Sequence, residues 1–187
     1  VVGAGTANTE FEVLTGMSMQ YFGTGEYPYK TILKQTDCES IADDLSQIGY
    51  GTHVVHNNTA TFYSRNNAFS MMGFDTFTSK ECMNISQYTP NGNWPTDDVL
   101  VQETVKAMNA TENQSDFVYT ITVEGHGDYP TEKLLENPDI LVSGAADEAS
   151  NNQWEYYVNM IHEVDDFIGD LITAVAVSYT HLRAHET

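Results

Sequence analysis

Residues 117–127 read Phe117-Val118-Tyr119-Thr120-Ile121-Thr122-Val123-Glu124-Gly125-His126-Gly127. The first seven of these residues are all aromatic or β-branched, which is typical of a strand. Two glycines then flank His126 and leave room for a ligand or another backbone to approach closely. The stretch therefore predicts a strand over 117–123 with a candidate site directly after its carboxyl end.

Patterns of helix and strand alternate along the rest of the chain. Residues 52–56, Thr52-His53-Val54-Val55-His56, predict a second short strand. Helices are expected after the Gly-rich start at 3–10, over 40–49, over 69–77 with a turn at Gly73, over 95–108 and over 151–174. Alternating elements, with polar clusters after strand ends, indicate an α/β fold: a mainly parallel sheet, flanking helices and a site at the carboxyl edge.

Two of the expected helices have a defined apolar face. In residues 40–49, the side chains of Ile41, Leu45 and Ile48 share one face ahead of Gly49. The helix over 151–174 has an apolar stripe made of Trp154, Tyr157, Val158, Ile161, Val164, Ile168, Leu171 and Ile172. We expect this long helix to pack on the sheet through that stripe.

The chain is strongly acidic, with 7 Lys and Arg against 27 Asp and Glu and a formal net charge of −20 at pH 7. This charge disfavours non-specific binding to nucleic acid or anionic lipid, so no nucleic-acid partner is expected. Any anionic substrate must be held by local cations. The pairs Asp43-Asp44, Asp97-Asp98 and Asp165-Asp166 lie in helical patterns and are interpreted as solvated faces.

The cysteines and the hydropathy exclude some classes of protein. Cys38 and Cys82 stand in no zinc-binding pattern, and their spacing does not decide whether they pair. The sequence has no apolar run long enough to span a membrane, so the chain is expected to be soluble.

Both ends of the chain read as cut ends. It begins Val1-Val2-Gly3 without a methionine, and the amphipathic pattern breaks off at residues 176–187, which resemble a translated adapter sequence. We therefore expect a partial catalytic domain over 1–175 and a non-native tail over 176–187. His181 and His185 lie in that tail and are excluded as a metal-binding pair.

The Gly-rich start is the first candidate for chemistry. Thr6 stands in the run Gly3-Ala4-Gly5-Thr6-Ala7-Asn8-Thr9-Glu10, at an expected helix N-terminus. Free N–H groups and the helix dipole favour a phosphate or another anion there. Thr6 or Asn8 also suits the role of a helix cap, which is the commoner role of such a threonine. The residues alone leave both interpretations open.

Two more candidates follow the expected strand over 52–56. His56 ends that strand, where it can donate to a substrate oxygen or serve as a hydrogen-bonded structural residue. Arg65 is the only arginine outside the tail and stands close to Phe62 and Tyr63. Its planar charged group suits an oxyanion, with a surface salt bridge as the alternative. We interpret His126 as functional because glycines flank it.

Taken in order, these clusters resemble the catalytic domain of lipoteichoic acid synthases, which are sulfatase-like phosphoglycerol transferases of the alkaline phosphatase superfamily. Gly5-Thr6-Ala7-Asn8-Thr9-Glu10-Phe11-Glu12-Val13-Leu14-Thr15-Gly16 is similar to that family's nucleophile segment. The resemblance implies that Thr6 is both the attacking group and a metal ligand. It also implies substrate binding by five residues, which are His56, Asn58, Tyr63, Arg65 and His126.

The sequence departs from the family pattern at several positions. Asn57 stands where glycine is usual, Asn58 replaces an acid and Tyr63 replaces tryptophan, so the headgroup preference can differ from the family's. After His126, the sequence Gly127-Asp128-Tyr129-Pro130 carries an extra polar residue. The family's metal-binding glutamate precedes the nucleophile and its Asp-His pair follows the long helix, so both are expected outside this chain.

The resemblance implies a metal-dependent reaction in which Thr6 transfers phosphoglycerol from phosphatidylglycerol, an anionic glycerophospholipid, to a glycerophosphate polymer of the cell envelope. The implied cofactor is a divalent cation, Mn²⁺ or Mg²⁺. The implied parent is anchored in the membrane, with its catalytic domain at the extracellular face of the bacterial cell.

Two other functions are weighed against this one. The first is a sulfatase-like hydrolase or phosphodiesterase of the same fold, acting on phosphate or sulfate esters, although the chain contains no Cys/Ser-x-Pro-x-Arg segment. The second is an inactive fragment that acts only as a binding module. In either case, we expect the chain by itself to be inactive because the metal ligands lie elsewhere.

Overall fold

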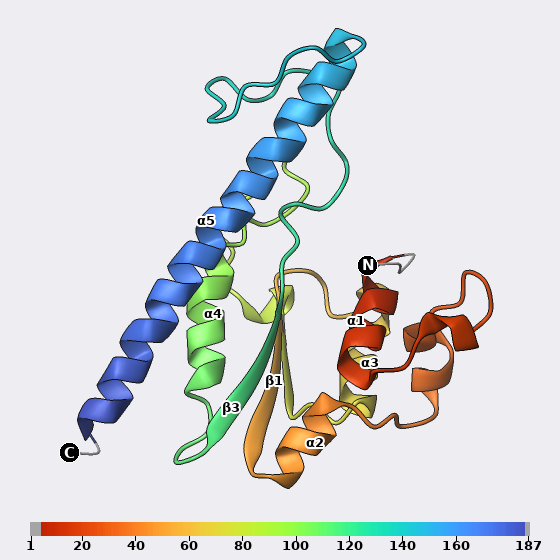
Figure 1. Cartoon of the computed structure of the whole chain (residues 1–187), viewed down its shortest axis with the longest axis vertical. Helices are drawn as coiled ribbons and strands as arrows, with labels where there is room; N and C mark the ends of the chain where they lie inside the picture. Colours follow the sequence, from red (N-terminus) through yellow and green to blue (C-terminus); the bar gives the residue numbers. More distant parts are fainter. Residues whose placement is uncertain (1–4, 186–187) are drawn as a thin grey trace.

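One parallel sheet forms the centre of the molecule. The structure is a computed structural model that describes the backbone of residues 5–185 and the side chains of residues 5–177. Its strands are β1 Tyr50–His56, β2 Thr76–Ser79 and β3 Ser115–Ile121, in the order β2-β1-β3, and every pairing is parallel. The predicted α/β fold with a parallel sheet and flanking helices is confirmed (Figure 1).

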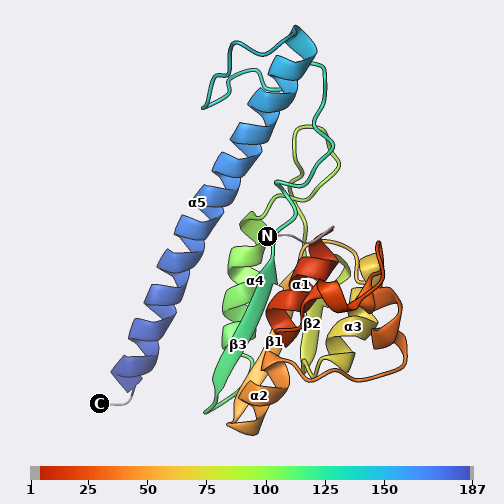
Figure 2. The same ribbon diagram turned by 45° about the vertical axis from the view of Figure 1, so that its right-hand side comes forward.

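Helices cover both faces of the sheet. They are α1 Thr6–Thr15, α2 Ile41–Gln47, α3 Arg65–Met71, α4 Asp98–Met108 and α5 Glu148–His185. Short 3-10 helices lie at Met19–Tyr21, Pro28–Lys30, Ile32–Lys34, Phe62–Ser64 and Lys80–Cys82. Figures 1 and 2 show α1, α2 and α3 on one face, and α4 with α5 on the other.

The central strand β1 joins the two halves of the core. Val54 belongs to the cluster under α1, α2 and α3, whereas Val55 belongs to the cluster under α4 and α5. Successive side chains of a strand point to opposite faces, and both valines are fully buried. Burial of a side chain of this kind contributes roughly 1.5–3 kcal/mol. The strand predicted over 52–56 is confirmed and begins earlier, at Tyr50.

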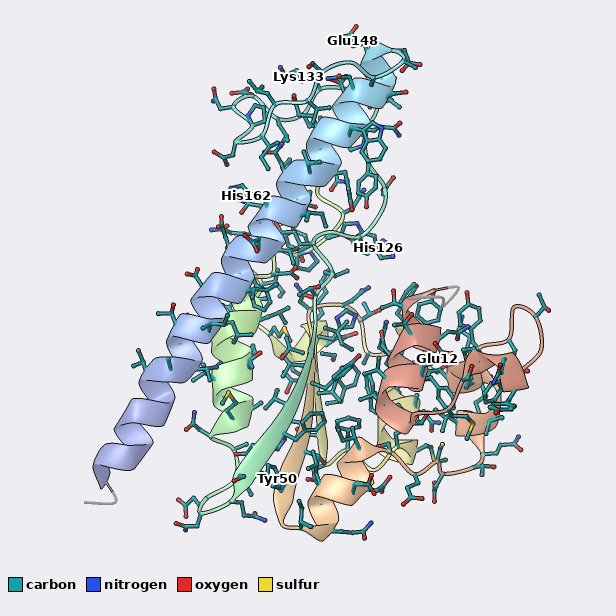
Figure 3. The ribbon with its side chains drawn as sticks, in the orientation of Figure 1. Glu12, Tyr50, His126, Lys133, Glu148 and His162 are labelled. Carbon is teal, nitrogen blue, oxygen red and sulfur yellow. The ribbon has the colours of Figure 1, made fainter. Side chains whose placement is uncertain are left out.

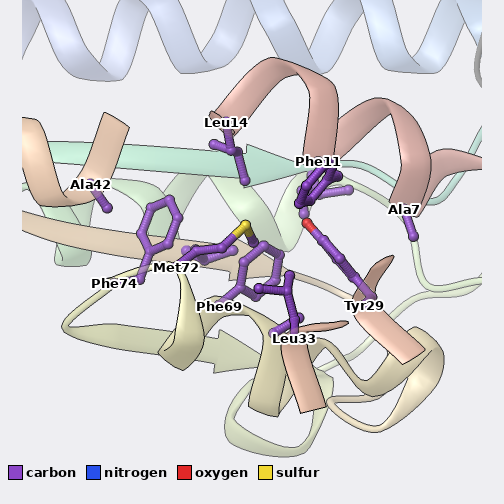
Figure 4. Close-up of a cluster of buried hydrophobic side chains, with 12 residues drawn as sticks. Ala7, Phe11, Leu14, Tyr29, Leu33, Ala42, Phe69, Met72 and Phe74 are labelled. Carbon is purple, nitrogen blue, oxygen red and sulfur yellow. The ribbon is translucent and has the colours of Figure 1, made fainter. Parts of the chain in front are cut away.

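Aromatic side chains fill the larger of the two clusters. Phe69 of α3 makes edge contacts with Tyr29, Phe74 and Phe77 at ring distances of 5.8, 5.7 and 5.0 Å. Phe11 of α1 lies in the same cluster and is 1% exposed (Figure 4). These contacts fix α1 against the sheet, and thereby fix the position of its first residue.

The predicted packing of the long C-terminal helix is wrong. Trp154, Ile161, Ile168 and Ile172 of the expected stripe are between 42 and 65% exposed. The buried side chains of α5 come from a neighbouring face and include Tyr156, Met160 and Phe167. The reason is that α4 covers this side of the sheet, so that α5 packs mainly against α4.

Two shorter elements also differ from expectation. In α2 the buried residue is Ala42, whereas Ile41 and Ile48 are exposed, so the face expected from the apolar pattern is wrong. A capping box of Ser40 and Asp43 begins this helix. The helix expected over 69–77 begins earlier and ends at Met71, since the chain turns at Gly73 and continues into β2.

The C-terminal helix continues past the boundary that the sequence suggested. α5 runs without a break to His185, so residues 176–185 are helical, while the side chains of residues 178–187, including His181 and His185, lie outside the described part. The assignment of 176–187 as a non-native tail stays a prediction.

Both Cys38 and Cys82 are free. None of the described helices is both long and apolar enough to cross a bilayer.

Candidate active site at the carboxyl edge of the sheet

The three strands end at one edge of the sheet, and α1 begins beside that edge (Figures 1 and 2). Parallel sheets of α/β proteins usually place their ligand sites at this edge. His56 is the last residue of β1, and the loop that carries His126 leaves β3 at the same end, as Figure 3 shows. The edge therefore gathers several of the residues that the sequence indicated.

Thr6 is the first residue of α1, directly after Gly5. Gly5 has φ of +92°, a backbone conformation that residues with a side chain rarely adopt. A Cβ at this position would lie 3.2 Å from the Tyr27 hydroxyl and 3.3 Å from the Tyr63 hydroxyl. Both tyrosines therefore border the turn that presents Thr6, and only glycine fits that turn without strain.

Thr6 does not cap the helix. Gly5 occupies the N-cap position of α1, and the exposed Thr6 side chain makes no hydrogen bond with another residue in the described part of the chain. Asn8 lies inside the helix and donates instead to the backbone carbonyl of Glu26 at 3.0 Å. The capping alternative is therefore wrong for both residues, and the Thr6 hydroxyl is free for another partner.

Arg65 forms a buried ion pair with Glu10 of α1. Its Nε donates to Oε2 of Glu10 at 3.1 Å, and its Nη2 donates to Oε1 at 2.6 Å. The exposed fraction of each side chain is 2%, so the alternative of a surface salt bridge is wrong. The third nitrogen, Nη1, is buried without a hydrogen-bond partner in the described structure. Nη1 is therefore the guanidinium nitrogen of Arg65 that has no acceptor among the described residues.

Tyr63 connects Arg65 with the start of α1. Its backbone has φ of +58°, and the next residue, Ser64, has φ of +60°, both unusual for residues with a side chain. The Arg65 guanidinium lies 5.3 Å from the centre of the Tyr63 ring, close enough for a cation–π contact. Burial raises the pKa of the Tyr63 hydroxyl, and the neighbouring Tyr27 raises it further. Tyr63 therefore keeps its proton at neutral pH.

His56 is a neutral histidine. Burial, and then the charge of Arg65, lower its pKa to about 4. Its Nδ1 lies 2.8 Å from the carbonyl oxygen of Ile121, so Nδ1 carries the proton and Nε2 is an acceptor. His56 can therefore donate to a substrate oxygen from Nε2 only after it gains a second proton.

His126 lies apart from this group. Its ring lies against Trp94 in a tilted arrangement, with 4.7 Å between the ring centroids, and His126 is exposed. Hydrogen bonds from Trp94 Nε1 to the Gly127 carbonyl at 3.0 Å, and from Asn91 Nδ2 to the Asp128 carbonyl at 2.9 Å, hold its loop. Tyr63 borders the turn before Thr6 and contacts the guanidinium of Arg65, whose charge acts on His56. No contact joins His126 to these residues in the described part of the chain.

Asn58 also lies apart from these residues. Its side-chain oxygen accepts from the backbone of Thr59 at 2.7 Å, and its carbonyl accepts from the backbone of Lys80 at 3.0 Å. These bonds are local to the loop after β1. The role of Asn58 in substrate binding stays a prediction.

A buried network of carboxylates joins the loops after β1 and β3. Asp97 accepts hydrogen bonds from Asn57 Nδ2 at 2.8 Å and from the backbone of Val123 at 3.0 Å. In return, the backbone of Asp97 donates to Glu124 Oε2 at 2.8 Å. The interpretation of Asp97 as part of a solvated face is wrong, because these donors hold it at 0% exposure directly before α4. Asp98 is the exposed member of that pair.

The ionisation of Glu124 is predicted to lower the free energy of unfolding as the pH rises. Burial raises its pKa from an ordinary value near 4.5 to about 7, so the unfolded chain ionises first. This contribution to stability is complete below pH 4.5 and is lost as the pH rises through 7, by about 3 kcal/mol in total. Glu124→Gln keeps the acceptor and removes the titration. The free energy of unfolding, measured by urea titration, should therefore increase for Glu124→Gln relative to the unchanged chain as the pH rises from 4.5 to 7.

The exposed Glu112 provides a matched control for this pH series. Glu112→Gln should differ from the unchanged chain by less than about 0.5 kcal/mol at every pH, as surface substitutions usually do. A Glu124→Gln difference that stays constant from pH 4.5 to 7 would show that Glu124 does not titrate in this way.

The described residues do not complete a metal site. Within residues 5–177, no group of three or more histidine, cysteine, aspartate or glutamate side chains is arranged to hold a metal ion. The hydroxyl of Thr6 is exposed and free, which suits a single ligand bond.

Several residues of the site were not among the site residues predicted from the sequence. Glu10 holds Arg65, Tyr27 borders Gly5, and the Asp97–Glu124 pair braces the loops. The spacing of four residues between Thr6 and Glu10 on one helix face was a signal for Glu10. The sequence has no comparable signal for Tyr27, because its contact with Gly5 depends on the path of the loop between α1 and α2.

The chain belongs to the sulfatase family, since the profile of that family matches residues 1–179. Members of this family are enzymes, and they typically use divalent metals. A protein of Rhizobium meliloti (strain 1021), named for cyclic beta-1,2-glucan modification, is 30% identical over 164 residues. That match covers 88% of this chain and 25% of the relative.

Two solved structures share the fold. The lipoteichoic acid synthase LtaP from Listeria monocytogenes matches with a TM-score of 0.69 and 22% identity, over 93% of this chain and 41% of that one. The Streptococcus pyogenes phosphoglycerol transferase GacH, in complex with sn-glycerol-1-phosphate, matches with a TM-score of 0.73 and 20% identity, over 92% of this chain and 45% of that one. The chain thus spans less than half the length of these proteins.

Proposed function

We propose that this chain is the nucleophile-bearing part of a phosphoglycerol transferase. The observation that carries the proposal is the free, exposed hydroxyl of Thr6 at the start of α1, directly after the turn that Tyr63 borders. The Tyr63 ring in turn contacts the buried Arg65, whose Nη1 is unpartnered in the described structure. A helix N-terminus, a guanidinium donor and a hydroxyl suit the binding and attack of a phosphoryl group. The likeness to LtaP and GacH supports this reaction class.

In the proposed reaction, the Thr6 oxygen attacks the phosphorus of phosphatidylglycerol. A bond forms between that oxygen and phosphorus, and the bond from phosphorus to the diacylglycerol oxygen breaks. The Thr6 hydroxyl loses its proton, and the leaving oxygen gains one to give diacylglycerol. A glycerol hydroxyl of the acceptor polymer then attacks the same phosphorus and releases Thr6 with its proton restored.

The other residues stabilise negative charge on the phosphoryl oxygens. Arg65 offers Nη1, while Glu10 keeps its guanidinium in place through two hydrogen bonds. An anionic phosphate near His56 raises the pKa of the imidazole, so that Nε2 gains a proton and becomes a donor. His126 and Asn58 contribute contacts at the sides of the substrate, and Tyr63 contacts its headgroup.

We also propose the setting of this activity. A divalent cation, Mn²⁺ or Mg²⁺, bound to Thr6 and to ligands beyond the described residues, supplies Lewis-acid polarisation of the hydroxyl when present. The parent protein is anchored in the bacterial membrane with this domain at the extracellular face. The chain alone is inactive, because residues 5–177 hold no complete set of metal ligands.

The test measures which donor is used by the full-length protein that carries this chain. We expect release of diacylglycerol from phosphatidylglycerol in the presence of Mn²⁺ and a glycerophosphate acceptor, and no release of sulfate from an aryl sulfate. Sulfate release without diacylglycerol release would instead favour the hydrolase alternative. Phosphate-ester cleavage that ignores the acceptor would indicate a phosphodiesterase.

A further inference from the structure

A lysine that the resemblance did not indicate lies against the two tyrosines that border the start of α1. Lys30 ends the 3-10 helix Pro28–Lys30, and its side chain is exposed. Its Nζ lies 4.8 Å from the centre of the Tyr63 ring and 5.4 Å from the centre of the Tyr27 ring. At these distances both rings attract the ammonium group through their π faces.

The two tyrosines connect Lys30 to the start of α1. Their rings lie 5.2 Å apart, and both hydroxyls border Gly5, which immediately precedes Thr6. Arg65 also contacts the Tyr63 ring, at 5.3 Å. Two cations therefore meet at Tyr63: one is buried and paired with Glu10, and the other is exposed.

Lys30 has no carboxylate partner in the part of the chain that the structure describes, where the ion pairs are those of His53, Arg65 and Lys106. What distinguishes Lys30 from the exposed Lys34 is its contact with the two tyrosine rings that border Gly5. The aromatic faces hold the stem and charge of Lys30, while its N–H groups stay available to an acceptor. A charge held in this way against the tyrosines that border the turn before Thr6 suits an anionic ligand.

We propose that Lys30 is a specificity-determining residue that binds a phosphate oxygen of the substrate beside Thr6, with Tyr27 and Tyr63 holding its ammonium group in position. The inference rests on the proposed function, because it assigns Lys30 to the same phosphate ester that Thr6 attacks. It explains how so acidic a chain attracts an anionic substrate to this edge of the sheet.

The test uses the full-length protein that carries this chain, with Lys30→Gln, Lys30→Arg and the control Lys34→Gln. Lys34 is also exposed, and no ring contact or ion pair fixes its side chain in the described structure. The probes are sn-glycerol-1-phosphate and neutral glycerol, measured by calorimetry. For Lys30→Gln we expect the Kd of the phosphate to rise about tenfold, as loss of one charged hydrogen bond predicts, with glycerol unaffected. Lys30→Arg should stay within about threefold.

Turnover of phosphatidylglycerol provides the second readout. Lys30→Gln should raise KM with a similar kcat, because the lost contact holds substrate and transition state alike. If Lys30→Gln binds and reacts like Lys34→Gln while the unchanged protein is active, the assignment of Lys30 is wrong and the proposed function stands. If the unchanged protein neither binds the phosphate nor turns over the lipid, both are wrong.

Discussion

Glu10→Ala is expected to destabilise the folded chain by about 3–5 kcal/mol, because it leaves the charge of Arg65 buried and unpaired. Both side chains of the pair are 2% exposed, and Glu10 accepts from two of the three guanidinium nitrogens. Water cannot replace those bonds without opening the contact between α1 and α3. The free energy of unfolding from chemical denaturation measures the loss, and hydrogen exchange should place it first in α1.

The chain offers a matched control for this substitution. Glu103 pairs with Lys106 at 2.6 Å, and although the Glu103 side chain is 11% exposed, the Lys106 side chain is 66% exposed, so its charge stays in water when the pair is broken. Glu103→Ala should therefore cost no more than about 0.5 kcal/mol. The double variant Glu10→Ala with Arg65→Met should be more stable than Glu10→Ala alone, since it removes the unpaired charge. Equal losses for Glu10→Ala and Glu103→Ala would contradict the buried pair.

Thr6→Ala is expected to abolish transfer in the full-length protein, with a loss of at least about ten-thousand-fold in kcat. The loss is this large because the Thr6 oxygen is the atom proposed to bond to phosphorus, and nothing else on α1 presents a free hydroxyl at the same place. Diacylglycerol release from phosphatidylglycerol measures it.

Thr6→Ser separates chemistry from structure at this position. Serine keeps the hydroxyl, so activity should return to within about tenfold of the unchanged protein. Neither substitution should shift the melting temperature by more than a few degrees, because the Thr6 side chain is exposed and makes no hydrogen bond in the described structure. A Thr6→Ala protein with normal turnover would remove Thr6 from the mechanism.

Strands β1 and β3 could be predicted from local sequence, whereas β2, which falls partly in the helix expected over 69–77, and the burial of helix faces could not. Strand β3 and the end of β1 at His56 follow from β-branched and aromatic runs. The face of α5 that is buried depends on α4, which lies between it and the sheet. Periodicity predicts that a helix has an apolar stripe. Which element covers that stripe depends on the whole fold.

In the candidate site, too, some features could be predicted from local sequence and others depend on the whole fold. The positions of Thr6 at a helix start and of His56 at a strand end could be predicted, because a Gly-rich turn and a strand end have local signals, although the N-cap is Gly5 and not Thr6. The pairing of Arg65 with Glu10 joins residues 55 positions apart, and the burial of Asp97 depends on donors from Asn57 and Val123. A charge pattern alone does not distinguish a solvated carboxylate from one buried among donors.

Intact-mass spectrometry of the full-length protein tests the central claim most directly. The protein would be incubated with Mn²⁺ and phosphatidylglycerol without an acceptor, quenched in acid and digested. The proposal predicts one added glycerophosphoryl group on the peptide that contains Thr6, and no such peptide from Thr6→Ala. Release of diacylglycerol with no adduct on Thr6, in a protein that turns over normally, would contradict it.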